Sequence, residues 1–290
     1  MHLIETSNLT KFYGKARGIK DISLSINEGE VFGFIGPNGA GKSTTIRILL
    51  ALIRPSSGEA KIAGLDCTKQ SKEIKKILGY VPSEVNYYDD MRVNDLLKYS
   101  ARFYRKDCNQ RIKELADRFE LDLHKKIDSL SYGNKKKVAI IQALIHEPKL
   151  LIFDEPTGGL DPLMQNIFFE TLEEEHKKGT TILFSSHILT EVQRMCDRVA
   201  IIKDGQLLKV EHVDELRKNN FKKVQLELGA AAKVNLQAEG ITKVEQKGNV
   251  VDFLYSGDMK QLACLLYSND ILNFVVEDPS LEEIFMHYYK

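Results

Sequence analysis

Tryptophan is absent from this sequence of 290 residues, and so is a net charge of either sign. The 41 Lys and Arg residues balance the 41 Asp and Glu residues, which excludes a global attraction to nucleic acid or anionic lipid. No apolar run reaches the roughly 18 residues that a membrane-spanning helix needs. The first residues, Met1-His2-Leu3-Ile4, lack the basic-then-apolar pattern of a secretory signal. We therefore expect a soluble protein of the cell interior.

Cysteine is scarce, with four residues that are scattered along the chain at positions 67, 108, 196 and 264. Because they form no Cys-x-x-Cys pair, a zinc site or a disulfide framework is not expected, and a reducing cytoplasm is the better environment. The rest of the composition, with 43% hydrophobic and 28% charged residues, is typical of a globular protein. The length allows one large domain or two.

The N-terminal half begins as a β-rich region. The alternation of Ile22, Leu24 and Ile26 predicts a half-buried antiparallel sheet, closed by a turn at residues 28–30. The apolar run Val31–Ile35 predicts a buried strand. A glycine-rich loop follows, and then a helix is predicted from about Lys42 to Ile53, ended by the Pro and Gly residues beyond it.

Strand and helix patterns alternate again further along the chain. Apolar runs at 150–153 and 180–184, each followed by a loop and a helix, predict a mostly parallel sheet. Residues 84–146 are helical in period and are interpreted as an insertion into this α/β core. We expect residues 1–215 to form this unit and residues 220–290 to form a small α+β domain that ends in a helix at 280–289.

The glycine-rich loop has the spacing of a phosphate-binding loop, G-x-x-x-x-G-K-[ST], over Gly36-Pro37-Asn38-Gly39-Ala40-Gly41-Lys42-Ser43. Glycines let the backbone curl so that its N–H groups point at phosphate oxygens, and the following helix adds its positive dipole end. We expect Lys42 to reach the β- and γ-phosphates, Ser43 to bind Mg²⁺, and Thr44 to bind the next phosphate. The alternative is a glycine turn that only caps a core helix.

Two acids, Asp154 and Glu155, follow the predicted strand at 150–153. Ligands of open α/β sheets bind at the carboxyl ends of the strands, where these acids would lie. With a phosphate loop present, Asp154 is predicted to be the outer-sphere partner of Mg²⁺. Glu155 is predicted to polarise the water that attacks the γ-phosphate. A lone Asp in such a place is often only a helix cap.

Four further segments, in order and spacing, resemble motifs of the ATP-binding cassette (ABC) family. Leu130-Ser131-Tyr132-Gly133-Asn134 is similar to the signature sequence, usually Leu-Ser-Gly-Gly-Gln, and Gly158-Gly159-Leu160-Asp161 is similar to the D-loop. Phe184-Ser185-Ser186-His187 resembles the segment with the switch histidine, and Tyr13 matches the aromatic residue that stacks on adenine. The resemblance covers about residues 1–215.

This resemblance implies a P-loop NTPase core with an antiparallel β subdomain, an inserted helical subdomain and the small C-terminal domain. It implies that Ser131 and the Gly133 backbone act at the ATP of a partner cassette, so that two cassettes sandwich two nucleotides, and that Asp161 of the D-loop takes part in nucleotide binding. It also implies that His187 contacts the γ-phosphate from its own subunit. The simpler alternatives are a satisfied histidine at a strand end, core packing for Tyr13 and a helix cap for Asp161.

The sequence departs from the family's pattern at two places. Ser83 stands where the family usually has a Gln that reaches Mg²⁺, and serine is too short to do so. The signature carries Tyr132 and Asn134 in place of Gly and Gln, while Gly133 is retained. We expect catalysis to persist at a lower rate. The basic run Lys135-Lys136-Lys137 is interpreted as a solvated helix face and not as a nucleic-acid patch.

The hypothesis is an ATP-hydrolysing subunit of an ABC transporter, of the exporter type, that works as a dimer, with a homodimer sufficient. It would lie on the cytoplasmic face of the cell membrane, bind ATP and Mg²⁺, and act on separate membrane permease subunits without binding nucleic acid. The C-terminal end, Glu277–Phe285, looks like that of cassettes paired with exporter-type permeases. The alternatives are a soluble ATPase acting on ribosomes or DNA, and a non-enzymatic nucleotide sensor.

Overall fold

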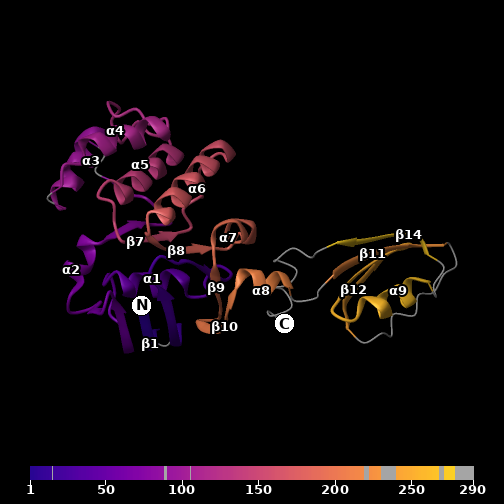
Figure 1. Ribbon diagram of the computed structural model, residues 1–290. Helices are drawn as coiled ribbons and strands as arrows, with labels where there is room; N and C mark the ends of the chain where they lie inside the picture. Colours follow the sequence, from indigo (N-terminus) through magenta and orange to yellow (C-terminus); the bar gives the residue numbers. More distant parts are fainter. Residues whose placement is uncertain are drawn as a thin grey trace. The chain divides into compact units, whose positions relative to one another are not determined.

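The chain divides into two compact units, Met1–Glu211 and His212–Lys290 (Figure 1). The structure is a computed structural model and describes residues 1–14, 16–87, 90–104, 106–218, 222–229, 240–267 and 271–277. None of the helices in these ranges is long and apolar enough to cross a membrane.

The first unit begins with a four-stranded sheet in the order β2-β1-β4-β5. Its strands are β1 (His2–Tyr13), β2 (Ala16–Asn27), β4 (Ser57–Ile62) and β5 (Leu65–Asp66), and β1 is antiparallel to both β2 and β4. The predicted antiparallel sheet is present, but the turn at 28–30 does not close it. The chain reverses direction between β1 and β2 near Gly14, whose φ is 59°. The turn at 28–30 instead leads from β2 to the first strand of the second sheet.

The second sheet has six strands in the order β10-β9-β3-β8-β7-β6. They are β3 (Val31–Ile35), β6 (Leu78–Val81), β7 (Leu150–Asp154), β8 (Thr181–Ser186), β9 (Arg198–Lys203) and β10 (Gln206–His212). The five strands from β9 to β6 are parallel, as the strand and helix alternation predicts. Every residue of β3, β7 and β8 is buried, which is typical of parallel strands covered on both faces.

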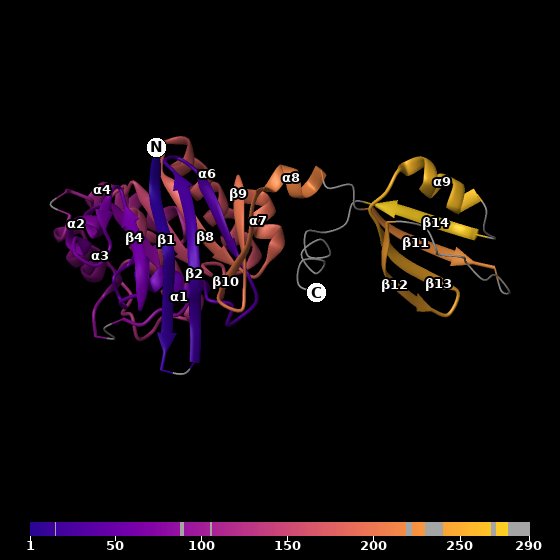
Figure 2. The same ribbon diagram turned by 90° about the horizontal axis from the view of Figure 1, so that it is seen from below.

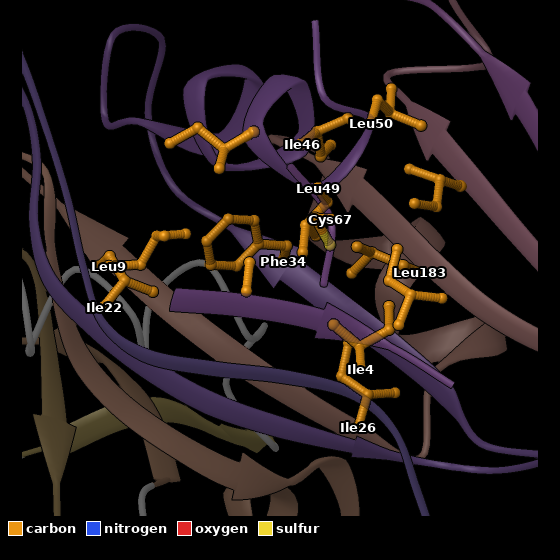
Figure 3. Packing of buried hydrophobic residues seen from close by; sticks show 14 of the residues in the cluster. Ile4, Leu9, Ile22, Ile26, Phe34, Ile46, Leu49, Leu50, Cys67 and Leu183 are labelled. Carbon is orange, nitrogen blue, oxygen red and sulfur yellow. The ribbon is translucent and has the colours of Figure 1, made fainter. Parts of the chain in front are cut away.

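Helix α1 (Lys42–Leu49) shares one hydrophobic core with both sheets. Figure 3 shows Ile46 and Leu49 of α1 near Phe34 of β3 and Ile4 of β1. The helix ends earlier than the predicted Ile53. Ala51 takes a φ of 54°, and the N–H groups of Ala51 and Leu52 donate to the carbonyls of Ile48 and Arg47. These two bonds satisfy the last carbonyls and terminate the helix before the proline.

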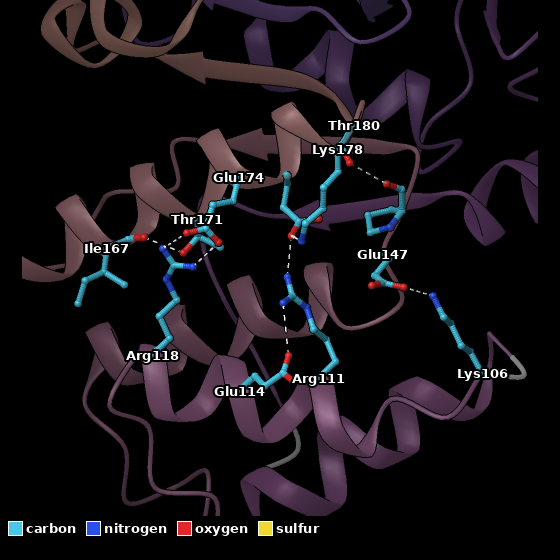
Figure 4. A network of polar contacts seen from close by, with 12 residues as sticks. Lys106, Arg111, Glu114, Arg118, Glu147, Ile167, Thr171, Glu174, Lys178 and Thr180 are labelled. Carbon is cyan, nitrogen blue, oxygen red and sulfur yellow. Dashed lines mark hydrogen bonds and ion pairs between the residues drawn. The ribbon is translucent and has the colours of Figure 1, made fainter.

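The other helices of this unit lie between β5 and β9 in the sequence. They are α2 (Ser71–Lys76), α3 (Val93–Arg102), α4 (Asn109–Arg118), α5 (Tyr132–Leu144), α6 (Pro162–Lys177) and α7 (Leu189–Met195). Figure 1 shows α3 to α6 together on one side of the second sheet. Ion pairs from Arg111 and Arg118 of α4 to Glu175 and Glu174 of α6 connect this group (Figure 4).

The second unit is a four-stranded antiparallel sheet in the order β12-β13-β11-β14, with one helix on it (Figure 2). Its elements are α8 (Val213–Lys218), β11 (Lys222–Leu228), β12 (Ile241–Lys247), β13 (Val250–Tyr255), α9 (Met259–Tyr267) and β14 (Ile271–Glu277). Phe253 and Tyr255 of β13 pack with Leu262 and Leu265 of α9 in a core of its own. The helix predicted at 280–289 lies outside the described residues.

Candidate functional site

The glycine-rich loop connects β3 to α1 at the carboxyl edge of the second sheet. Gly41 precedes α1 with a φ of 113°, in the region that favours glycine. The Lys42 ammonium is only 4% exposed, and its Nζ donates to the carbonyls of Gly36 at 2.7 Å and Pro37 at 3.3 Å. A Cβ on Gly36 would lie 2.4 Å from the carbonyl oxygen of Ile202, so no side chain fits there.

A cavity of about 200 Å³ lies on this loop. It brings together nine residues that the sequence predicts for the site, namely Tyr13, Asn38, Gly39, Ala40, Gly41, Lys42, Ser43, Thr44 and Glu155. Gly18 also lines it and was not predicted. A Cβ on Gly18 would lie 2.9 Å from the Tyr13 ring, so this glycine lets the ring pack against the backbone. A glycine inside a strand pattern is the signal that could have found it.

Asp154 is the last residue of β7 and is 1% exposed. Its Oδ1 accepts a hydrogen bond of 2.7 Å from the hydroxyl of Ser185, which lies opposite it on β8. The carboxylate is therefore buried with one direct partner among the described residues. Ser185 is a hydrogen-bond partner of Asp154 that the sequence motifs did not single out, because only strand pairing brings the two residues together.

Glu155 follows in a left-handed conformation, with a φ of 50°, which is uncommon for a non-glycine residue. Its N–H donates to the carbonyl of Ser185 at 3.1 Å. Its two carboxylate oxygens lie 3.3 Å from Lys42 Nζ and 3.3 Å from His187 Nδ1. Strands β7 and β8 and the phosphate loop thus bring the acid, the lysine and the histidine together.

Ser131, Gly133 and Asp161 do not line this cavity. The hydroxyl of Ser131 accepts from the N–H of Asn134 at 3.3 Å and caps α5. Asp161 Oδ1 accepts from the N–H of Met164 at 3.0 Å and caps α6, as the simpler alternative for this residue predicts. A Cβ on Gly133 would lie 2.4 Å from the carbonyl oxygen of Gly159, so the signature and D-loop segments are in close contact.

The two departures from the family's pattern contact each other. The Tyr132 hydroxyl donates to the backbone carbonyl of Ser83 at 3.0 Å, and the Tyr132 ring lies where a side chain on Gly159 would be. The tyrosine therefore bridges the loop after β6 and the D-loop segment. The sequence alone could not show this, because the three segments are far apart in the chain.

The interpretation of Lys135–Lys137 as a solvated helix face is wrong for Lys136. This side chain is 0% exposed, and Lys137 is also buried. Lys136 Nζ donates to the carbonyls of Pro82 at 2.8 Å, Ser83 at 3.0 Å and Glu155 at 3.2 Å. Burial lowers the pKa of Lys136 to about 8, against the opposing effect of Asp154 and Glu155. The reason is that α5 is buried on nearly all sides, so even its charged residues face protein.

The donor groups of the cavity fit a nucleotide triphosphate and a hard cation. Backbone N–H groups at a helix N-terminus and a buried ammonium suit phosphate, and the Ser43 hydroxyl offers an oxygen ligand. The Asp154 carboxylate, at the end of β7 and not among the residues that line the cavity, offers a second oxygen ligand. Among the described residues, no cluster of three or more His, Cys, Asp or Glu side chains forms a metal site. Such a pair of oxygens suits a cation whose remaining ligands are phosphates and water.

The sequence matches the family model described as "ABC transporter" over residues 19–158. It is 33% identical over 298 residues to the bacitracin transport ATP-binding protein BcrA of Bacillus licheniformis, covering 98% of this chain and 96% of that protein. It is 40% identical over 198 residues to the ABC transporter ATP-binding protein NatA of Bacillus subtilis (strain 168), covering 66% of this chain and 80% of that one.

Solved structures agree with these relatives. The fold matches the ATP-binding subunit of an ABC transporter with a TM-score of 0.71 at 32% identity, covering 74% of this chain and 92% of that one. It matches a dimeric ATP-binding cassette in a post-hydrolysis state with ADP and Pi at a TM-score of 0.66 and 26% identity, covering 72% of this chain and 98% of that one.

Proposed function

This chain belongs to the ABC transporter family as an ATP-binding subunit that hydrolyses ATP, and we propose that Glu155 is its general base. The observation that carries this proposal is the position of the Glu155 carboxylate, 3.3 Å from the phosphate-loop lysine and 3.3 Å from His187. A carboxylate beside the group that binds the γ-phosphate can orient a water for attack and accept its proton.

The other residues in and around the cavity are assigned by their chemistry. The loop Gly36–Gly41 and Lys42 would hold the phosphates, Thr44 would bind the next phosphate, and Tyr13 would stack on adenine. Mg²⁺ would be held by Ser43 and, through water, by Asp154, which Ser185 keeps oriented. When bound, this ion neutralises charge that develops on the phosphates. His187 would donate to the γ-phosphate.

The substitution Glu155→Gln tests the assignment of the base. The amide cannot accept the proton, so we expect ATP turnover to fall roughly 100-fold or more while ATP binding persists. A dimer that depends on ATP should then accumulate. Phosphate release measures the turnover, and size-exclusion chromatography with ATP measures the dimer.

The matched control is Glu170→Gln, which removes an exposed carboxylate from α6. We expect this variant to hydrolyse ATP at the unchanged rate. Unchanged hydrolysis in Glu155→Gln would show that Glu155 is not the base. Measuring both variants with and without Mg²⁺ tests the metal requirement at the same time.

The site is proposed to be completed by a second cassette. Ser131, Gly133 and Asp161 lie at helix N-termini outside the cavity, where backbone N–H groups are available to a nucleotide on a partner. One chain carries all of these motifs, so a homodimer suffices. That a matching solved cassette is dimeric supports this proposal.

The partner that couples hydrolysis to transport is proposed to be a membrane permease on a separate chain. A second cavity, of about 750 Å³, lies between α2 and α3 of the first unit. Lys72 and Lys76 line one side, and Tyr99 and Phe103, both exposed, line another. Such a groove suits a short amphipathic helix with an acidic edge. Copurification of this chain with a protein of about six apolar spans would test the proposal, and a neighbouring gene is the place to seek it.

The direction of transport is proposed to be export, from the cytoplasmic face of the membrane. The relatives include a linearmycin resistance ATP-binding protein of Bacillus subtilis, whose name supports removal of a toxic compound.

No nucleic-acid partner is expected, because the chain carries no net charge. The relatives are transport proteins, so an action on ribosomes or DNA is not favoured.

A further inference from the structure

Lys136 is a fully buried lysine at a place where the first turns of α5 meet the catalytic loop. A buried ammonium is costly unless its donors are satisfied. Lys136 has three N–H donors, and three backbone carbonyls accept from it, those of Pro82, Ser83 and Glu155. These acceptors belong to two segments, the loop after β6 and the residue after β7. The lysine therefore joins three parts of the first unit at one atom.

Glu155 needs such a contact because of its backbone. A left-handed conformation is strained for a non-glycine residue and persists only where its surroundings hold it. Two hydrogen bonds hold this peptide: its N–H donates to the carbonyl of Ser185, and its carbonyl accepts from Lys136. The backbone conformation in turn fixes the direction in which the Glu155 carboxylate leaves the chain, toward Lys42 and His187.

We propose that Lys136 is a positioning residue for ATP hydrolysis: by binding the Glu155 carbonyl together with those of Pro82 and Ser83, it holds the catalytic carboxylate in its reactive direction. The proposal rests on the function proposed above, in which Glu155 is the base. Lys136 of α5 thereby connects the loop after β6 to the catalytic acid. The Ser83 side chain itself is too short to reach the metal.

The first test is Lys136→Met, which nearly keeps the volume of the unbranched side chain and removes the ammonium with its donors. We expect turnover to fall tenfold or more, which corresponds to at least about 1.4 kcal/mol of transition-state free energy. The dissociation constant for ATP should change less than threefold, because Lys136 does not line the nucleotide cavity. ATP-dependent dimers should accumulate, as they should in Glu155→Gln. Lys136→Gln keeps two N–H donors on a shorter side chain and should be intermediate in turnover.

The second test is a double-mutant cycle between Lys136 and Glu155. If Lys136 acts through Glu155, Lys136→Met should have no further effect on the residual turnover of Glu155→Gln. The control is Lys177→Met, an exposed lysine at the end of α6, which should leave turnover unchanged. Urea unfolding of each variant separates a loss of stability from a loss of turnover.

Three outcomes overturn the inference. Unchanged turnover in Lys136→Met shows that the contact is not needed. Loss of ATP binding or of ATP-dependent dimerisation together with turnover assigns the lysine to the fold. Additive effects in the double mutant show that Lys136 does not act through Glu155. If Glu155→Gln lowers turnover and Lys136→Met does not, this inference fails and the proposed base stands; if Glu155→Gln has no effect, the proposed base fails first.

Discussion

Gly41 shows at a single residue how the phosphate loop depends on backbone geometry. Its φ of 113° is open to glycine and strained for other residues. A Cβ there would also lie 2.6 Å from Ile19 Cγ2 and 3.3 Å from the carbonyl oxygen of Gly18, which lines the nucleotide cavity. A side chain at Gly41, beside Lys42, would therefore cause both backbone strain and steric overlap.

We predict that Gly41→Ala weakens ATP binding by at least about tenfold, or 1.4 kcal/mol. The reason is that the loop must shift away from β2 to accommodate the methyl group. Titration with a fluorescent ATP analogue measures the effect. The control is Gly64→Ala, where φ is 74° and no atom lies within 4 Å of the added Cβ. That variant should lose about 1 kcal/mol of stability and keep its affinity for ATP. Equal affinities in the two variants would contradict the argument.

At the scale of elements, α4 and α6 are held together by ion pairs that differ in burial (Figure 4). Glu175 is buried, and its Oε1 accepts from Arg111 at 2.6 Å and from Lys178 at 2.8 Å. Glu174, one residue earlier, is half-exposed and pairs with Arg118. Each arginine also has a second, longer contact, Arg111 with Glu114 at 3.7 Å and Arg118 with Glu170 at 4.0 Å. The two pairs therefore differ mainly in the burial of the carboxylate on α6.

We predict that Glu175→Gln lowers the free energy of unfolding by about 2–3 kcal/mol, because it removes the buried partner of Arg111 and leaves only the looser pair with Glu114, at 3.7 Å. Glu174→Gln is the matched control and should cost less than about 1 kcal/mol, since solvent and salt screen an exposed pair. Urea midpoints at low and high salt give both values. A loss in Glu174→Gln as large as that in Glu175→Gln would show that burial is not what decides the strength of this connection.

The element boundaries show where local sequence signals were sufficient. The apolar run of β3 was placed correctly, because a buried parallel strand reads as a continuous apolar run. The end of α1 was placed four residues too late, because the carbonyl bonds at Ala51 and Leu52 stop the helix without a glycine. The interpretation of the basic run on α5 is wrong for Lys136 and Lys137, since charge pattern alone does not show that a helix is buried over most of its surface.

At the scale of the whole molecule, the two units have separate cores. The core of the first unit joins both of its sheets and α1, and the core of the second joins β11, β13 and α9. All residues of the nucleotide cavity belong to the first unit. The second unit exposes apolar side chains on its strands, Val244, Leu272, Phe274 and Val275, which suits an interaction surface. We propose that this unit stabilises the dimer or regulates ATP turnover.

We predict that a chain truncated after Asn219 binds ATP with unchanged affinity but forms the ATP-dependent dimer at least about tenfold more weakly, or hydrolyses ATP at a changed rate. The first part follows from the location of the cavity, and the second from the proposed role of the second unit. Analytical ultracentrifugation with ATP and a phosphate-release assay measure the two quantities. Dimerisation and turnover equal to those of the full chain would exclude that role.

The sequence by itself determined the chemistry of this protein and its class of fold. The phosphate loop, the acids at the end of β7 and the histidine after β8 are short segments whose residue types predict their function. Nine of the predicted residues meet in one cavity. The alternation of strand and helix patterns predicts the mostly parallel sheet, and the carboxyl ends of its strands gather such loops at one edge.

Only the tertiary structure decided which residues support that chemistry. Ser185 reaches Asp154 across a strand pair, Tyr132 reaches Ser83 across 49 positions of the chain, and Lys136 reaches Glu155 from another helix. Each of these contacts joins segments that are distant in sequence, and two of the acceptors are backbone carbonyls, which every residue carries. A carbonyl has no signature in a sequence, so its partner becomes visible only when the chain is folded.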